Sequence, residues 1–488
     1  MSDLNDILGE NSLDYKKIIV RIKNEEELQE LSKKLDINLY KDILSITLPD
    51  KKVKSKKLNS SNSNKQKEWK NYWVGMPEFI QDEVESYAKI DFYIREDYLK
   101  YFCKKLNITI NEDTNTVLSI WYNKDKDDIL FKTNYKVLGG VEKGKYPIYI
   151  ISKGRWEYSA TSKHLSAMQV PHYVVVEPQE VEKYENTIGK SKYTTILELD
   201  MSFKDCYDSC DEEGDSKGVG KGSGPARNFC WEHSITNGHK WHWLMDDNID
   251  GFHRLHQNHK IKSGTGAIFK ATEDFVERFD NIAISGFNYS KFAVQASELP
   301  PFVFNTRIFS CILIRNDLPI RWRARYNEDV DLNLRAMKMG YATCQMNAFL
   351  ADKATTQTVK GGNTDEFYKS EGTLIKSKVL EKLHPDVVTV TWKFSRWHHY
   401  ADYTPFKNNR LSLNYSNKEL IENLSKLEKV NNYGTYIIEL REEDIKNKFL
   451  SRDLLENKYN KDQEIKNLES KYYSSDHKDN NKEDIGLF

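Results

Sequence analysis

The sequence predicts an α/β protein, with a small α+β repeat domain before the main domain and a charged helical tail after it. Short apolar strands alternate with helical stretches over about residues 145–411, the pattern of a largely parallel sheet covered by helices. Ahead of this region a strand-helix-strand pattern occurs twice. At 488 residues the chain is long enough for two or more domains and a large core.

Composition excludes some classes of protein. The chain has 73 Lys and Arg against 74 Asp and Glu, so it cannot coat nucleic acid with a uniformly basic surface, and a polyanion must be met by a local basic patch. No apolar run approaches the length of a membrane span, and the acidic start does not resemble an export signal. We therefore expect a soluble protein whose six Cys are free thiols in a reducing compartment.

The repeat lies within residues 1–55 and 87–135. Lys17–Ile37 and Lys89–Ile108 align as an alternating strand, an acidic helix start and a Lys-Lys-Leu helix end, and a second strand follows each copy. A β-α-β unit of this size buries too little surface to fold well alone, so we expect the two copies to pair. Between them, residues 56–86 form a connector, and Lys51–Lys70 holds eight Lys against one Glu. That stretch is either a solvated tether or a contact for phosphates.

Two predicted strands of the main region end in polar residues. Pro147–Ile151 leads into a tight turn with donors for an anion, and His172–Val176 ends in a carboxylate suited to a nucleobase or ribose. Ligands of open α/β sheets bind at the carboxyl ends of strands, which is where these residues fall. They are Ser152, Lys153, Arg155 and Glu177.

A third strand, Trp241–Met245, ends in Asp246, Asp247 and Asn248. Adjacent oxygen ligands at the end of a buried strand need a counter-charge, which a divalent cation bridging them to a diphosphate would supply. The Gly-rich stretch upstream lets the backbone approach phosphates, and Arg227 offers a bidentate donor. The alternative is a solvent-facing loop beside a Ser- and Gly-rich flap.

A fourth element begins at Asn327, where Glu328 and Asp329 open a helix that ends near Gly340. Acidic residues in a first turn commonly complement the helix dipole, but beside a sugar donor one of them would deprotonate an acceptor hydroxyl. The preceding stretch is rich in arginine, which either contacts phosphates or is paired within the protein. The arginines proposed for DNA are Arg307, Arg321, Arg323 and Arg325.

Together these residues resemble nucleotide-sugar glycosyltransferases of the Rossmann-like GT-A class. More closely, Ile151–Trp156, Val175–Glu180, Pro225–Asn228 and Asp246–Asn248 look like the TET-associated glycosyltransferases of bacteriophages, a resemblance that covers about residues 145–400. It implies transfer of a sugar from an NDP-sugar, with UDP-glucose or a similar UDP-sugar as the preferred donor, aided by Mn²⁺ or Mg²⁺. The implied acceptor is a 5-hydroxymethyl pyrimidine such as hydroxymethylcytosine in phage DNA, in the cytoplasm of the infected bacterial host.

The resemblance also implies roles for individual residues. Asp246 would meet the ribose or sugar, while Asp247 and Asn248 would meet the metal and the diphosphate. Arg227 would bind the nucleotide, and Glu328 or Asp329 would accept the proton of the acceptor hydroxyl. GT-A enzymes often complete the metal shell with a late histidine, for which His398 and His399 are the candidates here. Asn at the third position of the acidic motif removes one charge, which weakens the expectation of metal dependence.

Several alternatives remain open on sequence alone. The same donor residues would serve a glycosyltransferase acting on protein or polysaccharide, and the chain could also be a non-enzymatic DNA-binding scaffold. Cys206 and Cys210 with Cys230 and His233 are candidates for a structural zinc site. Other side chains have possible acceptor roles: His253, His256 and His259 on one helical face as phosphate contacts, and Phe287, Tyr289 and Phe304 as stacking partners for a flipped base or as core.

The end of the chain is expected to be helical and then disordered. Residues 412–473 have helical spacing and many charges, and residues 474–488 are too polar to pack.

Overall fold

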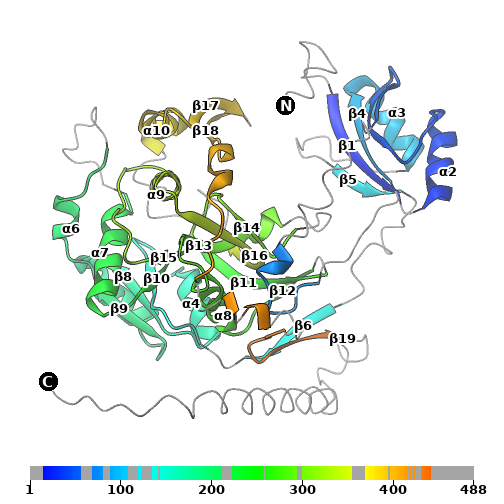
Figure 1. Cartoon of the computed structure of the whole chain (residues 1–488). Coiled ribbons are helices and arrows are strands. Elements are labelled where there is room, and N and C mark those ends of the chain that lie inside the picture. The colour runs from blue at the N-terminus through cyan, green and yellow to red at the C-terminus, as the bar shows by residue number, and fades with distance from the viewer. Residues whose placement is uncertain are drawn as a thin grey trace. The chain divides into compact units, whose positions relative to one another are not determined.

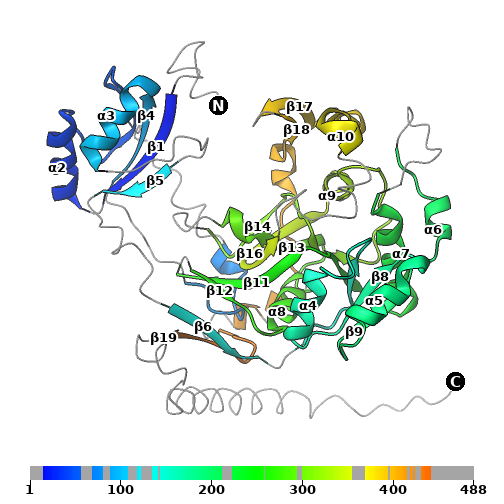
Figure 2. The ribbon, with the colours of Figure 1, turned by 180° about the vertical axis from the view of Figure 1, so that it is seen from behind.

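The computed structural model describes residues 15–22, 24–55, 69–80, 88–107, 118–122, 134–140, 143–210, 222–257, 259–293, 299–353, 369–393, 396–414, 418–419, 421–423 and 430–440. Figures 1 and 2 show the chain from two opposite sides. The remaining residues include most of the cationic stretch within 51–70, the greater part of the predicted helical tail and all of 474–488, so those predictions lie outside the described residues.

The two N-terminal segments form one sheet with the strand order β3-β2-β4-β1-β5. Its strands are β1 (Tyr15–Ile22), β2 (Ile43–Leu48), β3 (Lys52–Ser55), β4 (Ala88–Arg95) and β5 (Leu118–Trp121). The first strands of the two copies, β1 and β4, pair antiparallel at the centre, and each copy's second strand runs parallel to the other copy's first strand. Neither copy is therefore a self-contained β-α-β unit, because its two strands are separated by a strand of the other copy.

The helices of the two copies, α2 (Glu25–Leu35) and α3 (Glu96–Leu106), are alike in their ends. Each begins with acidic residues, ends with two lysines, and stops at a residue in the left-handed conformation, Asp36 or Asn107. Both helices pack into a single apolar core with the strands.

The main sheet joins ten strands of the described residues, in the order β12-β11-β16-β13-β15-β10-β7-β8-β9, with β14 on β16. The bounds are β7 (Ile148–Ile151), β8 (His172–Val176), β9 (Thr194–Glu198), β10 (Trp241–Asp246), β11 (Ile249–His256), β12 (His259–Lys262), β13 (Ile282–Tyr289), β14 (Phe302–Phe304), β15 (Cys311–Arg315) and β16 (Ala342–Lys353). The strands β10, β7, β8 and β9 are mutually parallel, as the alternation of strands and helices predicts. The sheet as a whole is mixed rather than largely parallel, because β15 runs antiparallel to both of its neighbours and β11, β12 and β14 also pair antiparallel.

Strand direction decides which residues meet. Because β13 is antiparallel to β15 and parallel to β16, both β13 and β16 point the same way as β10. The carboxyl ends of β7, β8, β10, β13 and β16 therefore lie at one edge of the sheet, and the start of β15 joins them there.

Helices cover both faces of this sheet (Figures 1 and 2). Alternate residues of β10 show the division: Trp243 belongs to the core beneath α4 (Ala160–Ala167), α5 (Val181–Thr187) and α8 (Ala267–Val276), whereas Leu244 belongs to the core beneath α7 (Gly224–Thr236) and α9 (Glu328–Lys338). Short helical elements complete the layers: η3 (Pro178–Glu180), α6 (Ser202–Asp205) and η4 (Ser290–Phe292).

Part of the predicted connector is a packed segment. Trp73 and Met76 are buried in the core of the main sheet, and the Arg278 guanidinium donates to the carbonyl of Val74 at 2.7 Å. Residues 69–80 of the predicted connector over 56–86 therefore pack against the main sheet. A single apolar cluster within a polar stretch has no periodicity from which its burial could be inferred.

The last part of the described chain adds a small layer on α9. It consists of α10 (Lys369–Leu383), the antiparallel hairpin of β17 (Val388–Lys393) and β18 (Arg396–Ala401), and η6 (Thr404–Asn408). The remaining strands, β6 (Asn134–Gly139) and β19 (Thr435–Leu440), pair with each other, so the extension predicted to be helical over 412–473 contains a strand. None of the helices among the described residues is both long and apolar enough to cross a membrane.

Candidate functional site

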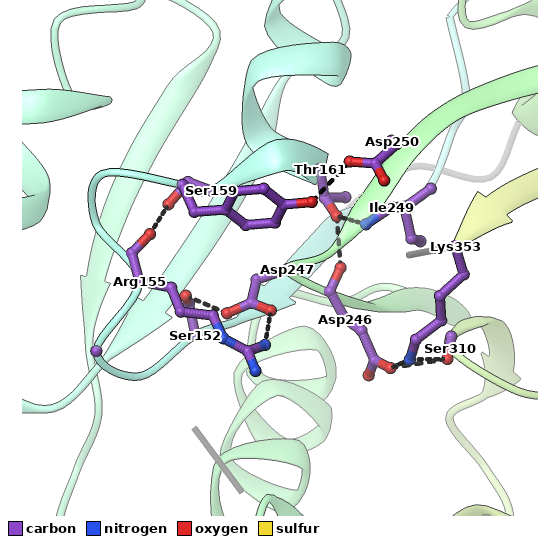
Figure 3. Close-up of polar contacts among 12 residues, drawn as sticks. Ser152, Arg155, Ser159, Thr161, Asp246, Asp247, Ile249, Asp250, Ser310 and Lys353 are labelled. Carbon is purple, nitrogen blue, oxygen red and sulfur yellow. Dashed lines mark hydrogen bonds and ion pairs between the residues drawn. The ribbon is translucent and has the colours of Figure 1, made fainter. Parts of the chain in front are cut away.

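Charged side chains converge at the carboxyl edge of the main sheet, where β7, β10 and β16 end. Figure 3 shows the two aspartates at the end of β10, each bonded to side chains from other elements. Asp246 is the last residue of β10, Lys353 is the last of β16, and Ser152 directly follows β7. Three segments that are remote in sequence thus meet at one place because their strands point the same way.

Asp246 is held by two cations. Its Oδ2 pairs with the ammonium of Lys353 and accepts from the Ser310 hydroxyl at 2.7 Å, and its Oδ1 lies 3.1 Å from the guanidinium of Arg227. Burial alone would raise the pKa of Asp246, but Lys353 and Arg227 hold it well below its usual range. Asp246 is therefore ionised at neutral pH. Sequence reasoning missed Lys353, although it ends an apolar strand just as Asp246 does.

Asp247 faces a third cation. The Arg155 guanidinium lies 2.6 Å from one carboxylate oxygen, and the Ser152 hydroxyl donates to the other at 2.6 Å (Figure 3). The Ser152 hydroxyl also bonds the phenol of Tyr184. Burial raises the pKa of Asp247, and Arg155 and Ser152 oppose that rise. The structure thus brings Ser152, Arg155 and Asp247 together.

The backbone after Asp246 is fixed by Thr161. The Thr161 hydroxyl donates to the carbonyl of Asp246 at 2.6 Å and accepts from the amide of Ile249 at 2.8 Å. Asn248 lies within this short turn and is buried, and its side-chain oxygen has no hydrogen-bond partner among the residues that the structure describes. A buried amide oxygen without a partner is costly unless a ligand or a water molecule donates to it.

The predicted general bases stand at the start of α9. Glu328 accepts from the Ser223 hydroxyl at 2.6 Å and lies 3.5 Å from Arg227, which also contacts Asp246. Asp329 is next to it, and burial together with the charge of Glu328 raises the pKa of Asp329 to about 6. Arg227 therefore links the carboxylates of β10 to those of α9. Its guanidinium also stacks on Trp322 at 4.7 Å, which fixes its orientation.

Glu177 forms a separate group at the end of β8. It pairs with Lys153 at 3.2 Å and with Lys204 at 2.5 Å, and Gln179 donates to its second oxygen. Burial raises the pKa of Glu177, but the opposing effects of Lys204 and Gln179 are larger together. The pKa of Glu177 therefore lies below its ordinary value. Lys153 and Glu177 are together as the sequence suggested, and their contact with a nucleotide stays a prediction.

The four arginines predicted for DNA have different surroundings. Arg323 pairs with the buried Asp331, Arg321 stacks on Trp231, and Arg325 stacks on Tyr326. Arg307 lies over Phe309 at 5.6 Å. Three of them thus stabilise the loop before α9, and DNA contact by any of the four stays a prediction.

The metal ligands that the resemblance implies are Asp247, Asn248, His398 and His399. Among the residues that the structure describes, no group of three His, Cys, Asp or Glu side chains could hold a metal ion. The zinc candidates Cys206, Cys210, Cys230 and His233 form no such group either. His398 and His399 belong to β18, where burial and the neighbouring Lys376 lower the pKa of His399 to about 4. The carboxylates of Asp246 and Asp247 already form ion pairs with Lys353 and Arg155, respectively. A role for Mn²⁺ or Mg²⁺ stays a prediction.

Other sequence interpretations require correction. His253 and His256 lie in β11 and His259 starts β12, so the three histidines share no helical face. Phe287 is buried against Phe269 in the core and cannot stack on a base.

The strands that carry this site fall within a stretch that matches a known family. Residues 146–362, which include β7, β10 and β16, match the model of the family described as TET-Associated Glycosyltransferase. No curated protein matches the chain.

Proposed function

We propose a reaction for this chain from the match of residues 146–362 to the TET-Associated Glycosyltransferase family. The protein transfers a sugar from an NDP-sugar, preferably a UDP-sugar, to the hydroxymethyl group of a 5-hydroxymethyl pyrimidine in DNA. The preferred acceptor is hydroxymethylcytosine in phage DNA, modified within an infected bacterial host. The glycosyltransferase activity follows from the family, whereas donor and acceptor are our proposals.

The observation that carries this proposal is the set of three cations at the carboxyl edge of the sheet. Arg155, Arg227 and Lys353 each bond a carboxylate of Asp246 or Asp247. When the bond between the sugar and the diphosphate breaks, negative charge grows on the diphosphate. Cations that are already oriented stabilise this charge at little reorganisation cost, so they favour the transition state over the bound donor.

The acceptor hydroxyl needs a base because its own pKa lies far above neutral pH. Asp329 is a suitable base, since a carboxyl with a pKa of about 6 is mostly ionised at neutral pH and still accepts a proton readily. In the proposed step the hydroxyl proton moves to Asp329, the hydroxyl oxygen bonds the anomeric carbon, and the diphosphate leaves with the bonding electrons. Such a single displacement inverts the anomeric configuration.

Glu328 has a different role in this mechanism. Because its carboxylate is held by Ser223 and Arg227, it orients Arg227 toward the leaving group and keeps negative charge beside Asp329. That charge contributes to the raised pKa of Asp329. Glu328 is thus a positioning residue, and Asp329 is the proton acceptor.

Mass spectrometry of nucleosides tests the proposal. DNA containing hydroxymethylcytosine is incubated with the protein and a panel of NDP-sugars, with and without a chelator, and then digested. We expect a hexosylated or pentosylated nucleoside with at least one donor, and the anomeric configuration of the product identifies inversion or retention. Asp329→Asn should lose most of the product, whereas the matched control Asp317→Asn removes a carboxylate that pairs with Arg315 at the other end of β15 and should not. Transfer only to protein or polysaccharide acceptors would refute the DNA assignment.

A further inference from the structure

The hairpin of β17 and β18 carries two exposed tryptophans at its outer end. Trp392 and Trp397 face each other in the register of the hairpin and so lie on the same face, with 59% and 38% of their surfaces exposed. Their rings meet edge to face, with the centroids 5.2 Å apart. Large aromatic surfaces left in water at the end of a hairpin indicate a binding role rather than a packing role.

The inner end of the same face is anchored to the candidate site. Val388 and Ala401, paired in the hairpin, pack against Val330 and Leu334 of α9, the helix that begins with the proposed base. The side chain of Asn327, the residue before α9, also donates to the carbonyl of Lys376 in α10 at 2.8 Å. Figure 1 shows β17, β18 and α10 beside α9. The tryptophans are therefore carried by a unit fixed to the acceptor side of the site.

Cationic side chains act on the inner half of the hairpin. His399, between the tryptophans and the anchored end, is within electrostatic reach of Lys376 and Arg307. Glu381, a carboxylate near the hairpin, accepts a hydrogen bond from the amide of Val390 at 2.8 Å. A single nucleic-acid strand binds such a surface in two ways: its bases stack on the aromatic rings and its phosphates contact the cations.

We propose that Trp392 and Trp397 form a stacking platform for the bases of a single DNA strand next to the nucleotide that receives the sugar. This inference rests on the proposed function and specifies how its acceptor is held. A base presents its flat face to an indole only when it is unpaired, so the platform binds an opened strand rather than an intact duplex. Sugars also stack on tryptophan, but a neutral glycan carries no charge that Lys376 and Arg307 would attract.

Fluorescence anisotropy with a labelled single-stranded oligonucleotide tests the platform across a range of salt concentrations. Stacking of a base on an aromatic ring contributes to affinity, so Trp392→Ala and Trp397→Ala should each raise Kd about 5- to 150-fold. The dependence of Kd on salt should not change, because stacking releases no counterions. Arg307→Ala should instead flatten that dependence, and Trp392→Phe should keep most of the affinity.

The matched control is Tyr101→Ala, which removes another exposed aromatic side chain, in α3 of the N-terminal sheet. It should leave Kd unchanged. UDP-glucose binding, measured by calorimetry on the same variants, should equal that of the wild type, since the platform binds DNA bases rather than the nucleotide-sugar.

The outcomes are distinct. Unchanged affinity in both tryptophan variants, no binding of the oligonucleotide by the wild type, or loss of binding to a neutral glucan instead of DNA would each overturn the platform. If the wild type binds the strand through the tryptophans but transfers no sugar to hydroxymethylated DNA, the proposed function fails and the platform stands.

Discussion

Replacing Lys353 with methionine removes one of the two cations that hold Asp246. The Lys353 ammonium pairs with Oδ2 of Asp246 and donates to the Ser310 hydroxyl at 2.5 Å, while Arg227 lies 3.1 Å from Oδ1. Methionine keeps the length and apolar stem of the side chain, so the change removes chiefly the charge. It separates the contribution of Lys353 to folding from its contribution to the reaction.

The expected effects on folding and on catalysis differ in size. Breaking a fully buried ion pair costs about 3–5 kcal/mol. Here Arg227 remains and the Asp246 side chain is 22% exposed, so we expect the free energy of unfolding to fall by about 1–2 kcal/mol. Removing a preoriented charge from the growing negative charge of a transition state lowers kcat by about 10²–10³. The loss in rate should therefore exceed what partial unfolding could cause.

The assay measures kcat and KM for sugar transfer at saturating DNA, together with denaturant unfolding of each variant. Lys353→Arg should restore part of kcat because it restores the charge. The matched control Lys270→Met also breaks a Lys–Asp pair, with Asp274 in α8, and should leave kcat unchanged. If Lys353→Met loses stability but keeps its kcat, Lys353 is only structural and the reasoning about the diphosphate is refuted.

Three further predictions concern pH and packing. For Asp329, kcat/KM of the wild type should fall as the pH drops through about 6, because the protonated carboxyl cannot accept the hydroxyl proton; an activity that does not change between pH 5 and 8 would contradict this. Burial raises the pKa of Glu273 from 4.5 to about 7, so its stabilising contribution is complete below pH 4.5 and is lost as the pH rises through 7. The free energy of unfolding should therefore fall by about 1–3 kcal/mol between pH 4.5 and 7, which thermal unfolding would show as a lower Tm. In Glu273→Gln, Tm should depend less on pH. Finally, Trp73→Ala should lower the free energy of unfolding by about 3–5 kcal/mol, since Trp73 is buried in the main core; a denaturation midpoint equal to that of the wild type would show that residues 69–80 do not contribute to it.

Local patterns in the sequence are enough to locate the ends of the main strands. The strand before Ser152, the strand before Asp246 and the helix that begins at Glu328 lie where apolar periodicity and cap residues predict them. The family match over residues 146–362 confirms the resemblance that those motifs indicate. Such features are recognisable because they depend on neighbours in sequence.

Local patterns also mislead in identifiable places. Their spacing predicts that His253, His256 and His259 share a helical face, but these histidines lie in the strands β11 and β12. The polar composition around residues 69–80 predicts a connector, but Trp73 is buried in the main core. In both cases contacts with distant strands or helices outweigh the local pattern, as tertiary packing commonly does.

The sequence by itself determined the residue types at the strand ends: carboxylates after β10, donors after β7 and acids at the start of α9. Only the tertiary structure decided which cations meet those carboxylates. Lys353 reaches Asp246 because β16 and β10 run in the same direction, with the antiparallel β15 and the strand β13 between them. Strand order and direction are set by long-range hydrogen bonding and by burial of both sheet faces, which leave no signature in the residues next to Lys353.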